Sequence, residues 1–210
     1  MTESKWIDIS QPLTNEMAHF PGDTPLDYSL TYSIEQTGSV NVGQMTGSLH
    51  TGTHIDAPFH YDSKGITIDD LDINLAIGKA KVIDVSDVEK ITAETLQGFD
   101  FNGISRVLLH TSLPNNPNRF PDKMPDLDPG AAPLLKEKGV KLIGVDMPSV
   151  DAPDSKDLAT HHALYNNGIF ILENLMLDHV VPGDYELIAI PLAITGADAS
   201  PVRAVLRSLS

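Results

Sequence analysis

The 210-residue chain contains no cysteine. This absence excludes a disulfide framework and removes the thiolate as a nucleophile or a metal ligand. It is compatible with the reducing cytosol, so we expect a cytoplasmic protein. The opening residues, MTESKWIDIS, lack the basic and then apolar pattern of a secretory signal. No apolar stretch reaches the length of about 18 residues that a membrane span requires, so we expect no membrane segment.

Basic residues are also scarce, with 14 Lys and Arg against 29 Asp and Glu, which gives a formal net charge of −15. A surface this acidic repels nucleic acid, because phosphate binding requires basic patches. The same charge favours solubility and attracts cations without selecting among them. We therefore expect a small-molecule partner and no nucleic acid.

The pattern of hydrophobic residues predicts a folded domain of the α/β class. Hydrophobic residues make up 41% of the chain, and its length suits a single domain over residues 1–210. Apolar, β-branched runs predict strands and amphipathic runs between them predict helices, so a mixed sheet is expected. The predicted strands cover 28–34, 80–85, 106–111, 141–146, 168–173, 185–191 and 202–208, and the predicted helices cover 92–99, 128–139 and 158–168. The Pro- and Asn-rich segment 113–129 between them is expected to be a long binding loop or lid.

Polar residues crowd into SLHTGTHIDAPFH, residues 48–60. As a helix, this segment would point Asp56 away from His54, and Gly52 argues against a helix. As a strand, it would place every second side chain on one face, which brings His50, His54 and Asp56 together. We therefore predict a strand that runs back to His50, with Ile55 and Ala57 facing the core.

Two imidazoles and a carboxylate on one face form a ligand set for Zn²⁺, or for Mn²⁺ or Fe²⁺ at similar geometry. Three protein ligands leave a position open for water, which is the pattern of a catalytic site. Pro58 redirects the chain after the predicted strand, so His60 can stand across the site as an acid/base group. A metal site without catalysis and a purely structural domain are the alternatives.

A second cluster lies in THHALYNNGIFILEN. His161 and His162 are neighbours on a predicted helix and point about 100° apart, so at most one of them faces a given site. Glu173 closes an apolar strand, where a charged residue tends to lie at a site or at the edge of a sheet. A surface histidine pair and an ordinary strand-end glutamate explain the same residues equally well.

The segment HTGTHIDAPFH resembles the H-x-G-T-H-x-D-x-P-x-H motif of the metal-dependent cyclase-like hydrolases. The resemblance runs nearly end to end. It includes WIDISQPLTNEMAHFPGD near the start, LIGVDMPSVDAPDSKDLATHHALYNNGIFILENL in the middle, and GADASPVRAVLRSL at the close. It implies a compact, barrel-like mixed sheet with flanking helices, of the swivelling β/β/α type, in a homodimer.

The same resemblance implies a site with two zinc ions per subunit, with Mn²⁺ or another divalent metal as the alternative. His50, His54 and Asp56 match the ligands of the first metal, and Asp56 is able to bridge to the second. His161 and Glu173 match the remaining ligands of the second metal, because the family's histidine and glutamate are spaced as these are.

The resemblance also assigns the chemistry. It implies an amidohydrolase that cleaves a linear amide C–N bond with a metal-activated water and with His60 as the acid/base group. Trp6, Phe20 and Pro21 match an aromatic segment that lines the substrate pocket, and Trp6 is the expected substrate contact. Within the family, the chain is most similar to bacterial members that hydrolyse N-formyl-L-kynurenine to L-kynurenine and formate in tryptophan degradation. Hydrolysis of another small amide such as isatin, and metal binding without catalysis, are the alternatives.

Overall fold

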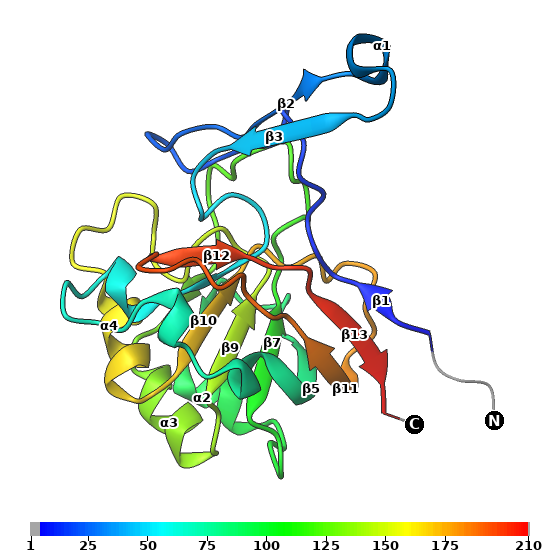
Figure 1. The fold of residues 1–210 in the computed structure, drawn as a ribbon. Helices are drawn as coiled ribbons and strands as arrows, with labels where there is room; N and C mark the ends of the chain where they lie inside the picture. The colour runs from blue at the N-terminus through cyan, green and yellow to red at the C-terminus, as the bar shows by residue number, and fades with distance from the viewer. Residues whose placement is uncertain (1–4, 210) are drawn as a thin grey trace.

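A nine-stranded mixed sheet forms the centre of the computed structural model, which describes residues 5–209. The sheet curls into a half-barrel, as Figure 1 shows. In spatial order, its strands are β1 (Ile7–Asp8), β13 (Val205–Ser208), β11 (Gly183–Ile188), β5 (Ile77–Asp84), β7 (Arg106–His110), β9 (Leu142–Val145), β10 (Phe170–Glu173), β4 (His54–Asp56) and β12 (Ala199–Pro201). The strands β5, β7, β9 and β10 are parallel, and the other pairings are antiparallel. The predicted mixed α/β fold is confirmed.

The central strands are apolar on both faces because each face has its own core. On β7, Val107 and Leu109 belong to one hydrophobic cluster, whereas Leu108 between them belongs to the other. This alternation is the period-2 pattern of a strand buried on both sides.

Helices cover one face of the sheet, on the lower left in Figure 1. They are α2 (Ala93–Gln97), α3 (Ala131–Glu137) and α4 (Ala159–Asn166). Their buried residues Leu96, Leu135 and Leu164 pack in the same cluster as Val107. Short elements complete the body, namely β6 (Lys90–Ile91), β8 (Asp126–Leu127) and the 3₁₀ turns Pro58–His60, Ile68–Asp70 and Ile73–Ala76. No helix of the described residues is long and apolar enough to cross a membrane.

The three predicted helices are present, but each is shorter than its sequence pattern. Helix α3 begins shortly after Asp128, and the Asp128 carboxylate accepts a hydrogen bond from the Gly130 N–H. It stops before Gly139, which adopts a left-handed φ of +83°. A glycine in this conformation ends a helix because a side chain there is strained.

The prediction of a strand that runs to His50 is wrong. Upstream of His50, the chain forms a hairpin arm (residues 27–46) that projects from the body in Figure 1. The arm contains β2 (Asp27–Tyr32), α1 (Ile34–Thr37) and β3 (Val42–Thr46). Turns replace the strand after Thr46, and Gly52 has a left-handed φ of +71° that interrupts extended pairing. Only His54 and Asp56 of the predicted face lie on a strand, and His50 approaches them from a loop.

Candidate metal centre

Strand pairing assembles the first part of the site. β4 lies antiparallel beside β10, with His54 opposite Glu173 and Asp56 opposite Ile171. Directly opposed residues share a face, so His54, Asp56 and Glu173 all point to the same side of the sheet. All three are buried, and His54 Nε2 lies 3.4 Å from Glu173 Oε2. Ile55 points to the opposite face and packs in the core there, as its position in the alternation requires.

His50 completes a compact triangle of ligand-type atoms. Its Nδ1 lies 3.2 Å from His54 Nε2 and 3.1 Å from Asp56 Oδ1. The third side, between His54 Nε2 and Asp56 Oδ1, is 3.2 Å long. Ligand atoms bound to a tetrahedral zinc ion at about 2.0–2.1 Å lie about 3.3 Å apart. The triangle therefore has the size and the chemistry of one face of such a coordination shell.

Both carboxylate oxygens of Asp56 are buried and lack a hydrogen-bond partner among the described residues. When the histidines around it are neutral, a buried, ionised carboxylate of this kind has no donor and is costly, and a bound cation removes that cost. The two oxygens face different neighbours, because Oδ1 lies with His50 and His54 whereas Oδ2 lies 3.6 Å from His161 Nε2. This arrangement fits a carboxylate that bridges two cations.

Helix α4 carries His161 to the second half of the cluster. The Nε2 atom of His161 lies 3.9 Å from Glu173 Oε1, in addition to its approach to Asp56. His162 is exposed, and its ring lies beside Tyr61 at 5.9 Å between centroids. The structure thus brings His161 to the cluster and leaves His162 outside it.

Each of the three histidines in the cluster is held from behind by a hydrogen bond from its other ring nitrogen to a protein oxygen. The pairs are His54 Nδ1 with Gly52 O at 2.8 Å, His161 Nδ1 with Asp151 Oδ2 at 2.6 Å, and His50 Nε2 with Asp198 Oδ2 at 3.0 Å. Since the outer nitrogen donates in each pair, the inner nitrogen of a neutral ring presents its lone pair to the cluster. Metal-bound histidines are oriented in this way in most proteins.

Asp151 and Asp198 are the members of this network that the sequence did not reveal. Asp151 also accepts hydrogen bonds from the backbone N–H groups of Thr160 and His161, so it caps α4 from outside the usual capping position. Local capping patterns cannot detect a partner that lies so far upstream of the helix. Asp198 lies in the segment GADASPVRAVLRSL, which is part of the family resemblance but gave no role for this carboxylate.

The buried carboxylates make the cluster attractive to positive charge. Burial alone lowers the pKa of His161, but Asp151 and Asp56 raise it to about 10. In the same way, carboxylate neighbours outweigh burial and raise the pKa of His54 to about 10. Burial raises the pKa of Asp56, but the surrounding histidines hold it well below its usual value. Protons and metal ions compete for such a site, because metal binding requires neutral imidazoles.

His60 stands beside the cluster on the 3₁₀ turn Pro58–His60. Its ring lies 4.0 Å from the His50 ring between centroids, and its Nδ1 lies 3.7 Å from Asp198 Oδ2. Burial lowers the pKa of His60, and the charge of His50 lowers it further. His60 also lines a cavity that opens beside the cluster, so its ring reaches both the cluster and a molecule bound in that cavity.

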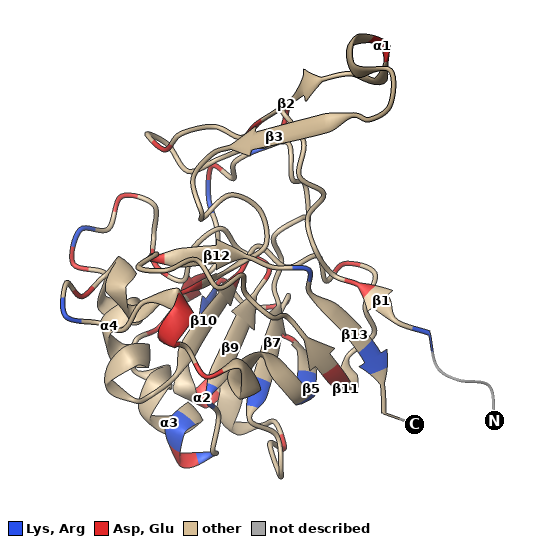
Figure 2. Cartoon of the chain, in the orientation of Figure 1, with Lys and Arg blue, Asp and Glu red and all other residues tan. Residues whose placement is uncertain are grey.

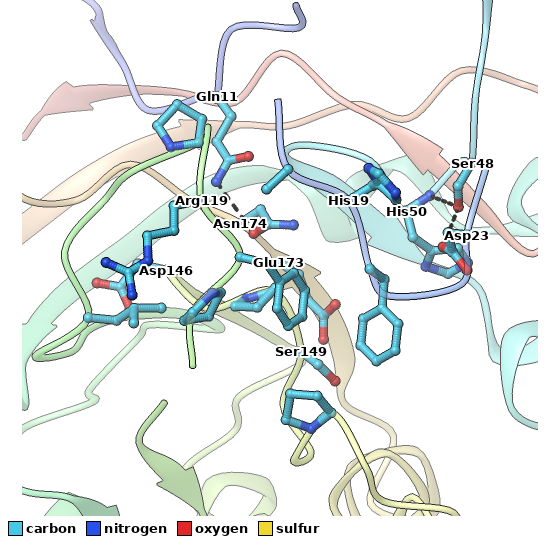
Figure 3. Close-up of a pocket in the computed structure, with 18 of the residues that line it drawn as sticks. Gln11, His19, Asp23, Ser48, His50, Arg119, Asp146, Ser149, Glu173 and Asn174 are labelled. Carbon is cyan, nitrogen blue, oxygen red and sulfur yellow. Dashed lines mark hydrogen bonds between the residues drawn. The ribbon is translucent and has the colours of Figure 1, made fainter. Parts of the chain in front are cut away.

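A cavity of about 410 Å³ opens beside the cluster. His50, His60, His161 and Glu173 border it, together with several residues of the predicted long loop, 113–129. In Figure 3, His50 and Arg119 lie on opposite sides of the cavity, and Glu173 and Asn174 lie between them. Phe20 and Phe120 meet edge to face in its lining, at 5.5 Å between ring centroids. The expectation that 113–129 is a binding loop agrees with this placement.

Trp6 does not border the cavity, so the structure does not bring it to the other predicted site residues, and its expected contact with substrate has no support within this chain. Trp6 precedes β1, and its ring packs under the Arg207 guanidinium, 4.6 Å from the ring centroid. β1 pairs with β13 at the far edge of the sheet, away from β4. Phe20, from the same aromatic segment, does border the cavity.

The curled mixed sheet with a His/carboxylate cluster at its edge defines a protein of the cyclase fold class. Residues 7–152 match the family model described as a putative cyclase, and the chain belongs to this Cyclase family.

Three similar proteins illustrate the relationship. The chain is 56% identical over 209 residues to the kynurenine formamidase of Bacillus anthracis, with 100% of both chains covered. A solved structure described as a potential metal-dependent hydrolase with cyclase activity is 27% identical, with a TM-score of 0.81 and 96% of each chain covered. An isatin hydrolase bound to the product analogue thioisatinate has a TM-score of 0.84 at 23% identity, over 98% of this chain and 93% of the other.

Proposed function

We propose that this chain is an arylformamidase that hydrolyses N-formyl-L-kynurenine to L-kynurenine and formate. The observation that carries the proposal is the buried Asp56 carboxylate, which has no hydrogen-bond partner among the described residues and lies between two groups of ligand-type atoms. The full-length similarity to a kynurenine formamidase supports the choice of substrate.

The proposed cofactor is a pair of zinc ions, held by five residues of this chain. His50, His54 and Asp56 would hold one ion, and His161 and Glu173 would hold the other together with Asp56, which matches the two groups of ligand-type atoms described above. When bound, such ions activate water as a nucleophile and polarise the amide carbonyl. Asp151 and Asp198 fix the orientation of His161 and His50, so the ligand atoms stay aligned.

His60 is the proposed acid/base residue. Its ring borders the cavity and does not belong to the triangle of His50, His54 and Asp56. In the proposed reaction, His60 accepts a proton from the attacking water and returns it to the aryl amine as the C–N bond breaks. Its lowered pKa favours the neutral ring, which is the form that accepts a proton.

The aromatic part of the lining explains how an aryl ring is held. Phe20 and Phe120 supply apolar surface in the same cavity as the cluster. A substrate ring that packs there is shielded from water, and its formyl carbon is directed toward the polar side of the cavity.

Removal of the metal tests the proposal. Purified protein is stripped with a chelator and reloaded with Zn²⁺ or Mn²⁺, and the bound metal per chain is counted by elemental analysis. We expect hydrolysis of N-formyl-L-kynurenine to disappear on stripping and to return on reloading. Isatin, a cyclic amide, is the comparison substrate, and faster turnover of isatin would overturn the assignment of substrate. Full metal loading without hydrolysis of any aryl formamide would instead indicate a metal-binding protein.

We also propose a homodimer that forms through the hairpin arm. Seven large hydrophobic residues of the arm are exposed, namely Tyr28, Leu30, Tyr32, Ile34, Val40, Val42 and Met45. The arm carries only Asp27 and Glu35 as charged residues, and Figure 2 shows it almost free of charge. Two chains of net charge −15 repel each other least where neutral surfaces meet. Light scattering is expected to give the mass of a dimer, and Leu30→Asp with Val42→Asp is expected to give a monomer.

A further inference from the structure

Apart from its histidines, the lining of the cavity holds one basic side chain and several acidic ones. Arg119 is the only Lys or Arg of the described residues that lines it. The carboxylates in the same lining belong to Asp23, Asp146, Glu173 and Asp198. Since the whole chain carries a net charge of −15, Arg119 is the basic side chain of the lining that can pair with an anionic group at a distance from the proposed metal site.

The acidic side chains of the lining already have partners within the protein. Asp23 accepts a hydrogen bond from Ser48, Asp198 pairs with His50, and both oxygens of Asp146 accept from Thr111. Glu173 belongs to the cluster and accepts from the backbone of Val150. Each of these carboxylates therefore already has a hydrogen-bond partner within the protein.

Arg119 is in a different position, because its carboxylate partner lies at the surface. It pairs with Asp122, and the two side chains are 69% and 83% exposed. An exposed ion pair of this kind contributes little to stability, since water screens it. A ligand carboxylate can therefore replace Asp122 at small cost.

The backbone that carries Arg119 is anchored to the body of the protein. Asn115 and Asp178 exchange hydrogen bonds, in which each backbone N–H donates to the other's side chain. The Ala18 N–H donates to Pro117 O at 2.8 Å, and the next aromatic residue, Phe120, packs on Phe20. The guanidinium is thus presented from a fixed segment at one end of the cavity, away from His50 (Figure 3).

We propose that Arg119 binds the α-carboxylate of an amino-acid substrate and so selects aryl formamides that carry an amino-acid side chain. This inference rests on the proposed function. N-formylkynurenine has its formamide at one end and its carboxylate at the other, which matches a cavity with ligand-type residues on one side and a guanidinium on the other. A guanidinium forms two parallel hydrogen bonds with a carboxylate, which gives both affinity and orientation.

The experiment compares two substrates on the zinc-loaded enzyme. One is N-formyl-L-kynurenine, and the other is N-formyl-2-aminoacetophenone, which keeps the aryl ketone and the formamide but lacks the amino acid. The measured quantity is the ratio of kcat/KM between them. We expect Arg119→Ala to lower this ratio about 10- to 100-fold, mainly through KM, and Arg119→Lys to restore part of it. Lys123→Ala is the matched control, because it removes the same charge from the same loop at a residue outside the lining.

The outcomes of this experiment distinguish a failure of the role of Arg119 from a failure of the proposed function. A ratio that is unchanged in Arg119→Ala, or that falls equally in Lys123→Ala, would overturn the role of Arg119 while the proposed function stands. A wild-type enzyme that hydrolyses neither formamide would overturn the proposed function, and the role of Arg119 with it.

Discussion

His54 and Glu173 are a directly opposed pair on the antiparallel strands β4 and β10, although they lie far apart in the sequence. The pairing leaves 3.4 Å between His54 Nε2 and Glu173 Oε2. Because side chains alternate along a strand, a slip of one residue in this register would turn His54 and Asp56 into the core and Ile55 into the site. The register of two strands therefore assembles three of the five side chains of the cluster, and His50 and His161 join them from a loop and a helix.

The adjacent histidines of α4 allow a matched pair of variants. His161→Ala is expected to lower bound zinc from two ions per chain toward one, because its Nε2 lies 3.6 Å from Asp56 Oδ2 at the second half of the cluster. His162→Ala removes an exposed imidazole one position away and is expected to keep both ions. Elemental analysis of the two purified variants measures the difference. Equal metal content in both would contradict the assignment of His161 as a ligand.

A variant of Asp151 tests whether the hydrogen bond behind His161 affects the affinity for metal. Asp151→Asn replaces the carboxylate that accepts from His161 Nδ1 at 2.6 Å, so the imidazole is held less firmly and is less basic. Loss of such a partner typically weakens metal binding about 10- to 100-fold. Competition with a chromogenic chelator measures the affinity. Asp154→Asn, an exposed change in the same segment, is the control and should leave the affinity at the wild-type value.

The strands and helices of the body could be predicted from the sequence because periodicity reports burial. β7 and β9 alternate between two cores, and the predicted runs 106–111 and 141–146 coincide with them within a residue or so at each end. The predicted strand at His50 failed because Gly52 takes a left-handed conformation that periodicity does not reveal.

The sequence predicted some of the side chains that gather in the cluster and missed others. His54 and Asp56 share a face as alternation requires, and the family resemblance named His161 and Glu173. The carboxylates behind His161 and His50 were missed, since Asp151 and Asp198 act through tertiary hydrogen bonds that leave no local pattern. The expected contact of Trp6 with substrate stays a prediction, and Trp6 lies outside the cavity because the pairing of β1 with β13 sets the path of the chain there.

His60 separates metal binding from turnover. His60→Ala is expected to keep both zinc ions, because the ring lies beside His50 rather than within the triangle of ligand-type atoms. It is expected to lower kcat about 10²- to 10⁴-fold, which is the usual effect of removing an acid/base group. Metal content and kcat are measured on the same preparation. A variant that loses metal along with activity would make His60 a ligand and would refute its role as the acid/base group.

Asp146 gives a prediction about stability that does not depend on the metal. Burial raises its pKa to about 6, although Thr111 donates to both carboxylate oxygens and lowers it. Because the ordinary value is 3.8, the folded protein holds this proton at pH values where the unfolded chain has lost it. The free energy of unfolding therefore falls as the pH rises from about 4 to about 6, by about 3 kcal/mol for a shift of this size.

Asp146→Asn is expected to remove this component. The asparagine oxygen can still accept from the Thr111 N–H, and its amide can donate to the Thr111 hydroxyl, so both contacts survive without a charge. Urea unfolding of the metal-free protein at about pH 4 to 8 gives the stability of both forms, and their difference cancels the dependence that all other groups share. The variant should gain stability relative to the wild type between about pH 4 and 6 and keep the gain above it. A difference that is flat across this range would show that Asp146 titrates alike in the folded and unfolded chains, and that its contacts with Thr111 offset the cost of burial in full.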